Sequence, residues 1–334
     1  MPASYALLFP GQASQKVGMG RALAADSPSA AAVFALAEEV TGLPITRLCF
    51  EGPDRDLVRT EFLQPCLAAT SLATLAAALE ESGAQDPSAP VSVASVPNPP
   101  RALAGHSVGE IPALAAAGAL ELRDAFKVVA ERARAMAEAG EANPGGMLAL
   151  IGGDLEGAYA LCELVDAGGP GFRLGVANLN APGQTIVAGA PEALKEAADI
   201  AREWGFRRAL ELPVSAAFHT PYMEPARSRL AELIKDLPVR DPRIPVVSNV
   251  SGDLISDAAS VREEICAQVV APVLWSRSVQ LLSSEGITSF FEVGPGNVLS
   301  GLLRRIIPSA RGIQVGEPEQ LRSLADSLNG TIHG

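Results

Sequence analysis

The chain has 334 residues, of which 48% are hydrophobic and 19% charged, and its formal net charge is −12. This length and apolar content predict one large domain with a second domain inserted or appended. The acidic balance argues against nucleic acid or an anionic membrane as a partner. Residues 1–10 lack a basic, signal-like segment, and the longest run rich in Ala and Leu, 67–79, is too short to span a bilayer. We therefore expect a cytoplasmic monomer.

The cysteines lie far apart in the chain and show no C-x-x-C spacing. Each sits beside apolar residues, which predicts buried free thiols rather than a zinc site or a disulfide framework. We therefore expect no bound metal. The cysteines are Cys49, Cys66, Cys162 and Cys266.

The first element expected along the chain is a buried strand over 5–9, which Pro10-Gly11 ends in a tight loop that carries Gln12. Helical patterns follow at about 28–40 and 65–82. The segment 85–100 is rich in Pro, Ser and Val, and we interpret it as an exposed surface loop.

The most informative motif is G-x-S-x-G at residues 105–109, between an apolar run, 102–104, and a helical pattern, 110–120. In a strand-turn-helix setting the two glycines allow a sharp, strained turn that lifts the hydroxyl of Ser107 clear of the sheet. With 31 glycines in the chain the pattern also arises by chance. The flanking strand and helix favour a nucleophile.

Arg132 carries a charge in an unusual place. On the helix expected over 121–140, its neighbours one turn away include Val129 and Met136, so its guanidinium emerges from the apolar stripe that should face the interior. A buried unpaired charge is costly, so an anion must meet it. One interpretation is a structural ion pair with a distant carboxylate. The other is a fixed site for the carboxylate of a substrate, because the planar guanidinium can bind both carboxylate oxygens at once.

Between residues 145 and 215 the pattern changes to β-α-β-β-α-β, which predicts a small ferredoxin-like domain. Its expected elements are strands 147–151, 173–179, 184–188 and 208–214 and helices 155–165 and 191–204. Strand 244–249, helix 258–270, strand 289–293 and helix 297–307 follow. The outer segments, 1–144 and 216–334, alternate strands and helices and predict a large α/β domain with a parallel sheet, which the small domain interrupts.

A serine nucleophile needs a base, and the chain has three histidines. His106 adjoins the serine, and His333 lies in a polar tail. His219 follows the strand expected over 208–214 and lies in a loop, where a lone histidine is usually structural. It is nevertheless the best candidate for a general base.

Six segments stand out in this order: FPGQASQ at 9–15, GHSVGE at 105–110, Arg132, NLNAPGQ at 178–184, FHTP at 218–221 and EVGPG at 292–296. Together they closely resemble the motifs of malonyl-CoA:acyl carrier protein transacylases, over about residues 5–306. The resemblance implies a hydrolase-like fold for the large domain. It also implies ping-pong transfer of a malonyl group from coenzyme A to the phosphopantetheine thiol of an acyl carrier protein, with malonyl-CoA as substrate and no metal or redox cofactor.

The resemblance also implies a role for each matching residue. Ser107 is acylated, His219 is the base, and Arg132 pairs with the malonyl carboxylate. The other implied positions are backbone N–H groups of an oxyanion hole at Gln12 and Val108, pocket positions Asn178, Asn180 and Phe218, and a main-chain carbonyl at Leu274 that orients the histidine. In related polyketide acyltransferases a phenylalanine directly before the base accompanies selection of malonyl over methylmalonyl. Ala13 stands where many members have glycine, and we expect that exchange to be neutral.

Three other functions remain as alternatives. A serine hydrolase would release the acyl group to water. An editing hydrolase would clear stalled acyl chains, although plain chains give Arg132 no partner. A non-catalytic scaffold that binds carrier proteins would need neither Ser107 nor His219.

Overall fold

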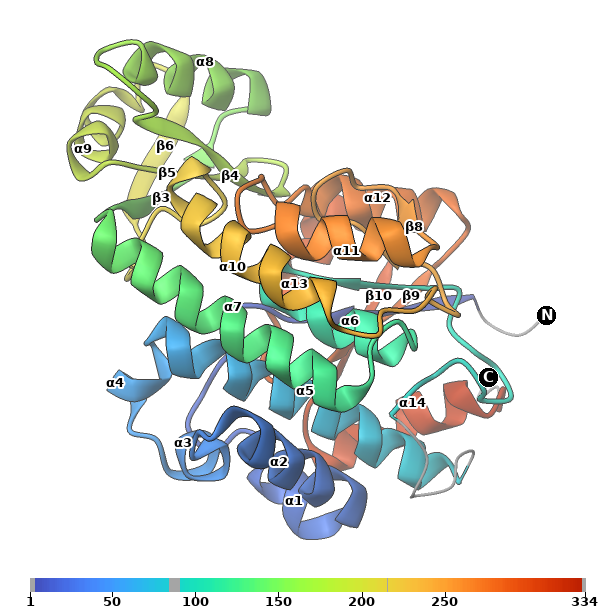
Figure 1. Ribbon diagram of the computed structural model, residues 1–334. Helices are drawn as coiled ribbons and strands as arrows, with labels where there is room; N and C mark the ends of the chain where they lie inside the picture. Colours follow the sequence, from blue (N-terminus) through green and yellow to red (C-terminus); the bar gives the residue numbers. More distant parts are fainter. Residues whose placement is uncertain (1–3, 84–90, 215, 332–334) are drawn as a thin grey trace.

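The computed structural model describes residues 4–83, 91–214 and 216–331. Its larger sheet has the strand order β10-β9-β1-β2-β7-β8 (Figure 1). Neighbouring strands in it are parallel except for β7 and β8. The strands are β1 (Tyr5–Phe9), β2 (Ala102–Gly105), β7 (Val246–Val247), β8 (Leu254–Ile255), β9 (Ser289–Val293) and β10 (Arg311–Val315). The parallel sheet expected of the large domain is confirmed.

Helices cover both faces of this sheet because the buried strands are apolar on both sides. Leu7 and Phe9 of β1 pack into the core built with α5 and α6, whereas Ala6 and Leu8 pack against α12 and α13 on the opposite face (Figure 1). The helices of the first side are α2 (Pro28–Thr41), α5 (Thr60–Ser82), α6 (Glu110–Ala116) and α7 (Leu122–Ala142). Those of the opposite face are α12 (Trp275–Ser284) and α13 (Val298–Ile306).

Helix α5 is longer than the apolar run that the sequence suggested. By length and composition it could cross a membrane, but 94% of its most apolar window is buried inside the protein. Its apolar surface therefore belongs to the core. The large domain also contains α1 (Arg21–Asp26), α3 (Ile45–Glu51), α4 (Asp54–Leu57), α10 (Glu224–Lys235), α11 (Ala258–Ala267) and α14 (Leu321–Leu328).

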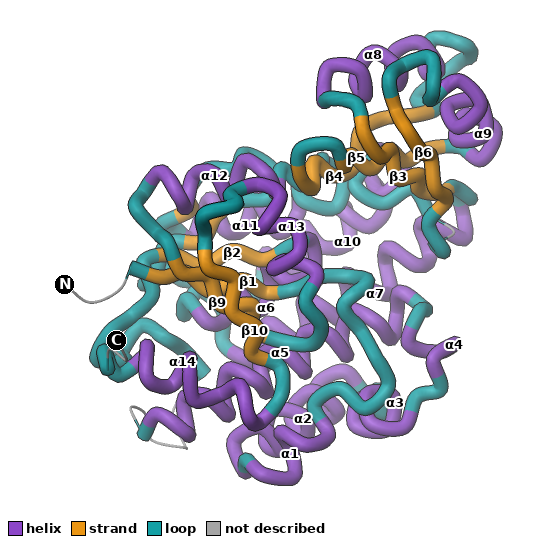
Figure 2. The backbone as a smooth tube through the Cα atoms, turned by 180° about the vertical axis from the view of Figure 1, so that it is seen from behind, coloured by secondary structure: helices purple, strands orange, loops and turns teal. Residues whose placement is uncertain are grey.

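The second sheet is antiparallel throughout and has the order β4-β5-β3-β6, as the split β-α-β arrangement requires. It consists of β3 (Gly146–Gly152), β4 (Leu174–Ala181), β5 (Gln184–Gly189) and β6 (Phe206–Glu211). One face packs on α8 (Leu155–Asp166) and α9 (Pro191–Ile200). Figure 2 shows this small domain projecting from the large one, with both helices on its outer side. The expected inserted domain is confirmed.

Strand β4 ties the small domain to the large one. The N–H of Leu179 donates to the carbonyl of Val273 at 2.9 Å, and the N–H of Val273 donates to the carbonyl of Ala177 at 2.9 Å. Arg305 of α13 donates to the carbonyl of Pro182 at 2.8 Å, in the turn between β4 and β5. The open face of the small sheet is thereby held beside the segments that follow β1 and β2.

Some sequence expectations need correction. The described part of the segment 85–100 is not simply exposed, because Val93 and Val96 are buried in the core; residues 85–90, like His333, lie outside the described residues. Cys49, Cys66 and Cys162 are buried free thiols, as expected, whereas Cys266 is only partly buried.

Candidate active site

Ser107 occupies the strained turn that the G-x-S-x-G motif predicts. Its φ is +51°, in the left-handed region that non-glycine residues rarely adopt. A Cβ on Gly105 would lie 2.0 Å from the carbonyl carbon of Gly109, and one on Gly109 would lie 2.1 Å from the carbonyl oxygen of Phe9. Only glycine fits at either position, because the turn packs against its own backbone at Gly105 and against β1 at Gly109.

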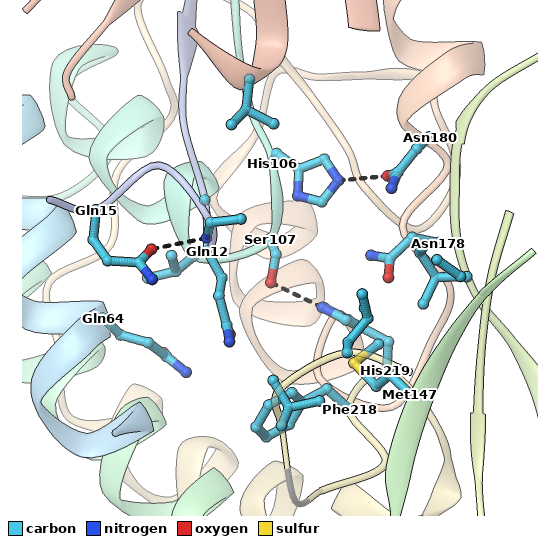
Figure 3. Close-up of a pocket in the computed structure, with 18 of the residues that line it drawn as sticks. Gln12, Gln15, Gln64, His106, Ser107, Met147, Asn178, Asn180, Phe218 and His219 are labelled. Carbon is cyan, nitrogen blue, oxygen red and sulfur yellow. Dashed lines mark hydrogen bonds between the residues drawn. The ribbon is translucent and has the colours of Figure 1, made fainter. Parts of the chain in front are cut away.

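His219 lies within hydrogen-bond distance of Ser107, where it can act as a general base. Its Nε2 lies 2.8 Å from the Ser107 Oγ (Figure 3). Its Nδ1 lies 2.8 Å from the carbonyl oxygen of Gln268. Since a carbonyl only accepts, Nδ1 carries the proton and the Nε2 lone pair faces the serine hydroxyl. The orienting carbonyl therefore belongs to Gln268, and the expectation of Leu274 was wrong: the Leu274 carbonyl accepts from the N–H of Ser278 at 3.0 Å.

The surroundings of His219 keep it neutral. Burial, and then the positive charge of Arg132, lower the pKa of His219 from 6.5 to about 3. The imidazole is therefore free to accept a proton at neutral pH.

Arg132 lies inside the protein, with 1% of its surface exposed, as its place on the apolar face of α7 predicted. Its Nη2 donates to the Ser107 Oγ at 3.0 Å and to the Gln268 Oε1 at 2.6 Å, and its Nη1 donates to the Gln64 Oε1 at 2.6 Å. Its Nε has no hydrogen-bond partner. Burial lowers the pKa of Arg132 to about 10, and the charge of Glu110 acts in the opposite direction. Among the described residues no carboxylate forms a direct salt bridge with Arg132, which argues against the structural ion pair.

A cavity of about 270 Å³ opens in front of Ser107, between the two domains. Figure 3 shows Ser107, His219 and Phe218 on one side of it, with Gln12 and Gln64 opposite and Asn178 and Asn180 from β4 nearby. Asn180 Oδ1 lies 2.8 Å from Nε2 of His106. All the expected site residues except Leu274 line the cavity: Gln12, Ser107, Val108, Arg132, Asn178, Asn180, Phe218 and His219.

The structure adds four polar residues that the sequence reasoning missed. Each is buried at the site. They are Gln64, Glu110, Asn249 and Gln268. In the described ranges no group of three or more His, Cys, Asp and Glu residues is arranged to hold a metal ion.

Comparison with known proteins agrees with this geometry. Residues 6–317 match the acyl transferase domain family. The chain is 38% identical to the malonyl CoA-acyl carrier protein transacylase of Bacillus subtilis, over 97% of this chain and 96% of the relative. An acyl-carrier-protein S-malonyltransferase from Bartonella henselae superposes with a TM-score of 0.89 at 33% identity, covering 97% of this chain and 99% of that one. A type II PKS malonyl-transacylase solved in complex with its acyl-carrier protein gives a TM-score of 0.87 at 33% identity, with coverage of 97% and 99%.

Proposed function

The chain belongs to the acyl transferase family, and we propose that it moves a malonyl group from coenzyme A to the phosphopantetheine thiol of an acyl carrier protein through an acyl-enzyme on Ser107. One observation carries the proposal. The Ser107 Oγ lies 2.8 Å from a neutral histidine nitrogen and 3.0 Å from a buried guanidinium, which places a nucleophile, a base and a fixed cation in one cavity.

The first half-reaction acylates the enzyme. His219 Nε2 takes the proton of Ser107, and the serine oxygen attacks the thioester carbonyl. The backbone N–H groups of Gln12 and Val108, two residues that line the cavity, stabilise the oxyanion. When the carbonyl re-forms, the C–S bond breaks and the coenzyme A sulfur receives the proton that His219 holds.

The second half-reaction reverses these roles. His219 takes the proton of the carrier thiol, the sulfur attacks the acyl-serine, and the breaking C–O bond returns its electrons and the proton to Ser107. These steps need no metal or redox cofactor. The relative solved with its carrier protein supports a carrier as acceptor, and the proposal includes a monomeric, cytoplasmic enzyme.

Arg132 selects the acyl group. In the free enzyme its Nη groups donate to two neutral amide oxygens, those of Gln64 and Gln268, and its Nε has no partner. A malonyl carboxylate at the guanidinium gains a charge-assisted hydrogen bond that acetyl cannot make. The cation therefore favours an acyl group that ends in a carboxylate.

The test is incubation with malonyl-CoA followed by intact mass. We expect a malonyl adduct that persists until carrier protein is added, no adduct in Ser107→Ala, and formation at least about a hundredfold slower in His219→Ala, because the hydroxyl is a weak nucleophile without its base. Adduct formation in Ser107→Ala would refute the proposed nucleophile. Rapid loss of the adduct to water without acceptor would indicate a hydrolase, and a wild-type protein that forms no adduct would indicate a scaffold.

A further inference from the structure

Glu110 has no part in the steps above, although it follows the nucleophile turn and none of its surface is exposed. Its Oε1 accepts from the backbone N–H of Asn249 at 2.8 Å and from the Asn249 Nδ2 at 2.9 Å. Its Oε2 accepts from Nε2 of Gln268 at 2.5 Å. Both oxygens of Glu110 accept from N–H donors, so the carboxyl fixes which end of each amide faces it.

The consequence for Gln268 is a fixed amide orientation. With Nε2 directed at Glu110 and at the Ser107 carbonyl, 2.9 Å away, the Oε1 must point to Nη2 of Arg132. If the amide turned over, its NH₂ group would face the guanidinium, donor against donor. The carbonyl that holds His219 belongs to the main chain of Gln268 and does not depend on this orientation.

Glu110 fixes the amide orientation of Asn249 in the same way. Its Nδ2 donates to Glu110 and to the carbonyl of Gly105 at 2.7 Å, which leaves its Oδ1 to accept from the N–H of Ser107 at 2.8 Å. A glutamine at position 110 could still accept from Asn249 through its own oxygen. Its NH₂ group would then face Nε2 of Gln268, donor against donor. The substitution therefore disturbs the orientation of the Gln268 amide more than that of Asn249.

A second buried carboxyl lies next to Glu110. Glu264 accepts from Oγ of Ser248 at 2.6 Å and from the N–H of Val250 at 3.1 Å. Burial, and then the neighbouring charge of Glu264, raise the pKa of Glu110.

We propose that Glu110 is a positioning residue for carboxylate recognition: by accepting from Nε2 of Gln268, it holds Gln268 Oε1 against Arg132 and keeps the guanidinium in place for the substrate carboxylate. This inference rests on the proposed function, because it requires Arg132 to bind the malonyl group. It assigns to Glu110 an effect on the choice of acyl group rather than on the Ser107–His219 chemistry.

The test compares malonyl-CoA with acetyl-CoA in single-turnover acylation. In Glu110→Gln we expect kcat/KM for malonyl-CoA to fall at least about tenfold and that for acetyl-CoA to change less than about threefold, because only the first substrate uses Arg132. Glu264→Gln is the matched control: it removes a carboxyl that touches Glu110 but not Gln268, and it should keep the ratio of the two rates within about twofold of the wild type. Equal losses on both substrates in Glu110→Gln, or the same change of ratio in Glu264→Gln, would overturn the inference.

Gln268→Leu provides a second route, which stands even if Glu110→Gln folds poorly. It removes the amide and keeps the main-chain carbonyl, so it should show the same selective loss on malonyl-CoA. The double variant should change the ratio no more than Gln268→Leu alone, since Glu110 acts through that amide. Additive effects, or equal losses on both substrates in Gln268→Leu, would overturn the inference. Arg132→Ala separates the two proposals: if it leaves the ratio unchanged, the proposed carboxylate-binding role of Arg132 fails, and if it alone changes the ratio, only the role of Glu110 fails.

Discussion

Backbone strain is concentrated at the residues of the site. Among the described residues other than glycine, those with positive φ are Ala13 at +79°, Ser107 at +51° and His219 at +61°. Each such conformation costs on the order of 1–3 kcal/mol and persists only where the surrounding structure over-determines it. Ala13 follows Gln12 in the loop after β1, so alanine in place of glycine carries a conformational cost there, and the expectation that the exchange is neutral does not hold for the backbone.

The pH dependence of acylation tests the state of His219. Its pKa is lowered to about 3, so the folded enzyme keeps a neutral base at pH values where an ordinary histidine is protonated. We expect single-turnover kcat/KM for malonyl-CoA, measured without carrier protein, to change less than about threefold between pH 7.5 and 5.5, since this parameter reports the free enzyme. A rate that falls with a midpoint near 6.5 would contradict the buried, neutral histidine.

The same shift has a consequence for stability, with a definite sign. Below pH 6.5 the unfolded chain takes up a proton at this histidine while the folded protein does not until about pH 3. Stability is therefore lost as the pH falls through that window, by about 1.4 kcal/mol per pH unit for one group. His219→Gln should lose this contribution, and urea denaturation at pH 7.5 and 5.5 provides the comparison.

Phe218 bears on which acyl group is accepted. It is buried next to His219 and lines the cavity. If its ring fills the space that an α-methyl group needs, the enzyme prefers malonyl-CoA to methylmalonyl-CoA, because one methyl group in a tight pocket is worth roughly 1–3 kcal/mol. We expect Phe218→Ser to narrow that preference in competition assays. Equal wild-type rates with the two substrates would rule the steric role out.

The sequence identified the residues that are locally unusual. Ser107 lies in a glycine motif, Arg132 interrupts an apolar helix face, and His219 remained after the other histidines were set aside. The sequence did not identify Gln268 and Asn249, because their roles depend on contacts between residues more than a hundred positions apart. One such contact is the hydrogen bond from the N–H of Ser107 to Asn249. An amide in a mixed segment gives no local sign of such a partner.

At the scale of elements, the nucleophile turn passes close to β1. A substitution that adds one methyl group to the turn tests this contact. Gly109→Ala should lower the melting temperature and abolish acylation, because its Cβ would lie 2.1 Å from the Phe9 carbonyl oxygen. Gly301→Ala in α13 is the matched control, since a Cβ there meets nothing within 4 Å. It should raise stability by about 0.4–1 kcal/mol. An active, undisturbed Gly109→Ala enzyme would show that the turn is less tightly packed than described.

Buried apolar strands and a long helix were predictable, and edge or irregular strands were not. Strands β1 and β9 were predicted at their observed bounds, and α2 within one residue. The strand expected over 244–249 shrinks to β7, which has two residues, because Pro245 cannot donate to a ladder and Asn249 bonds Glu110 instead. Strand β10 was missed, since it lies at the sheet edge and includes Arg311 and Gly312.

At the scale of the whole molecule, the site exists only when both domains are in place. Ser107 follows a strand of the large sheet, His219 follows the inserted domain, and β4 bonds to the backbone of Val273, a few residues after Gln268. The insertion could be inferred from the order of elements. The order of strands in the large sheet could not, because it depends on long-range packing that no local pattern records.

The most direct test of the account is a side-by-side transfer assay of Arg132→Ala with malonyl-CoA and acetyl-CoA. Removing the guanidinium leaves the malonyl carboxylate desolvated and unpaired, at a cost of roughly 2–5 kcal/mol in transition-state binding. We predict that kcat/KM for malonyl-CoA falls at least about thirtyfold while that for acetyl-CoA stays the same or improves, and that Arg132→Lys restores little, because an ammonium cannot make the two-pronged contact. Proportional losses on both substrates, in variants shown by melting to be folded, would contradict the account: Arg132 would then be structural, and selection of malonyl would need another source.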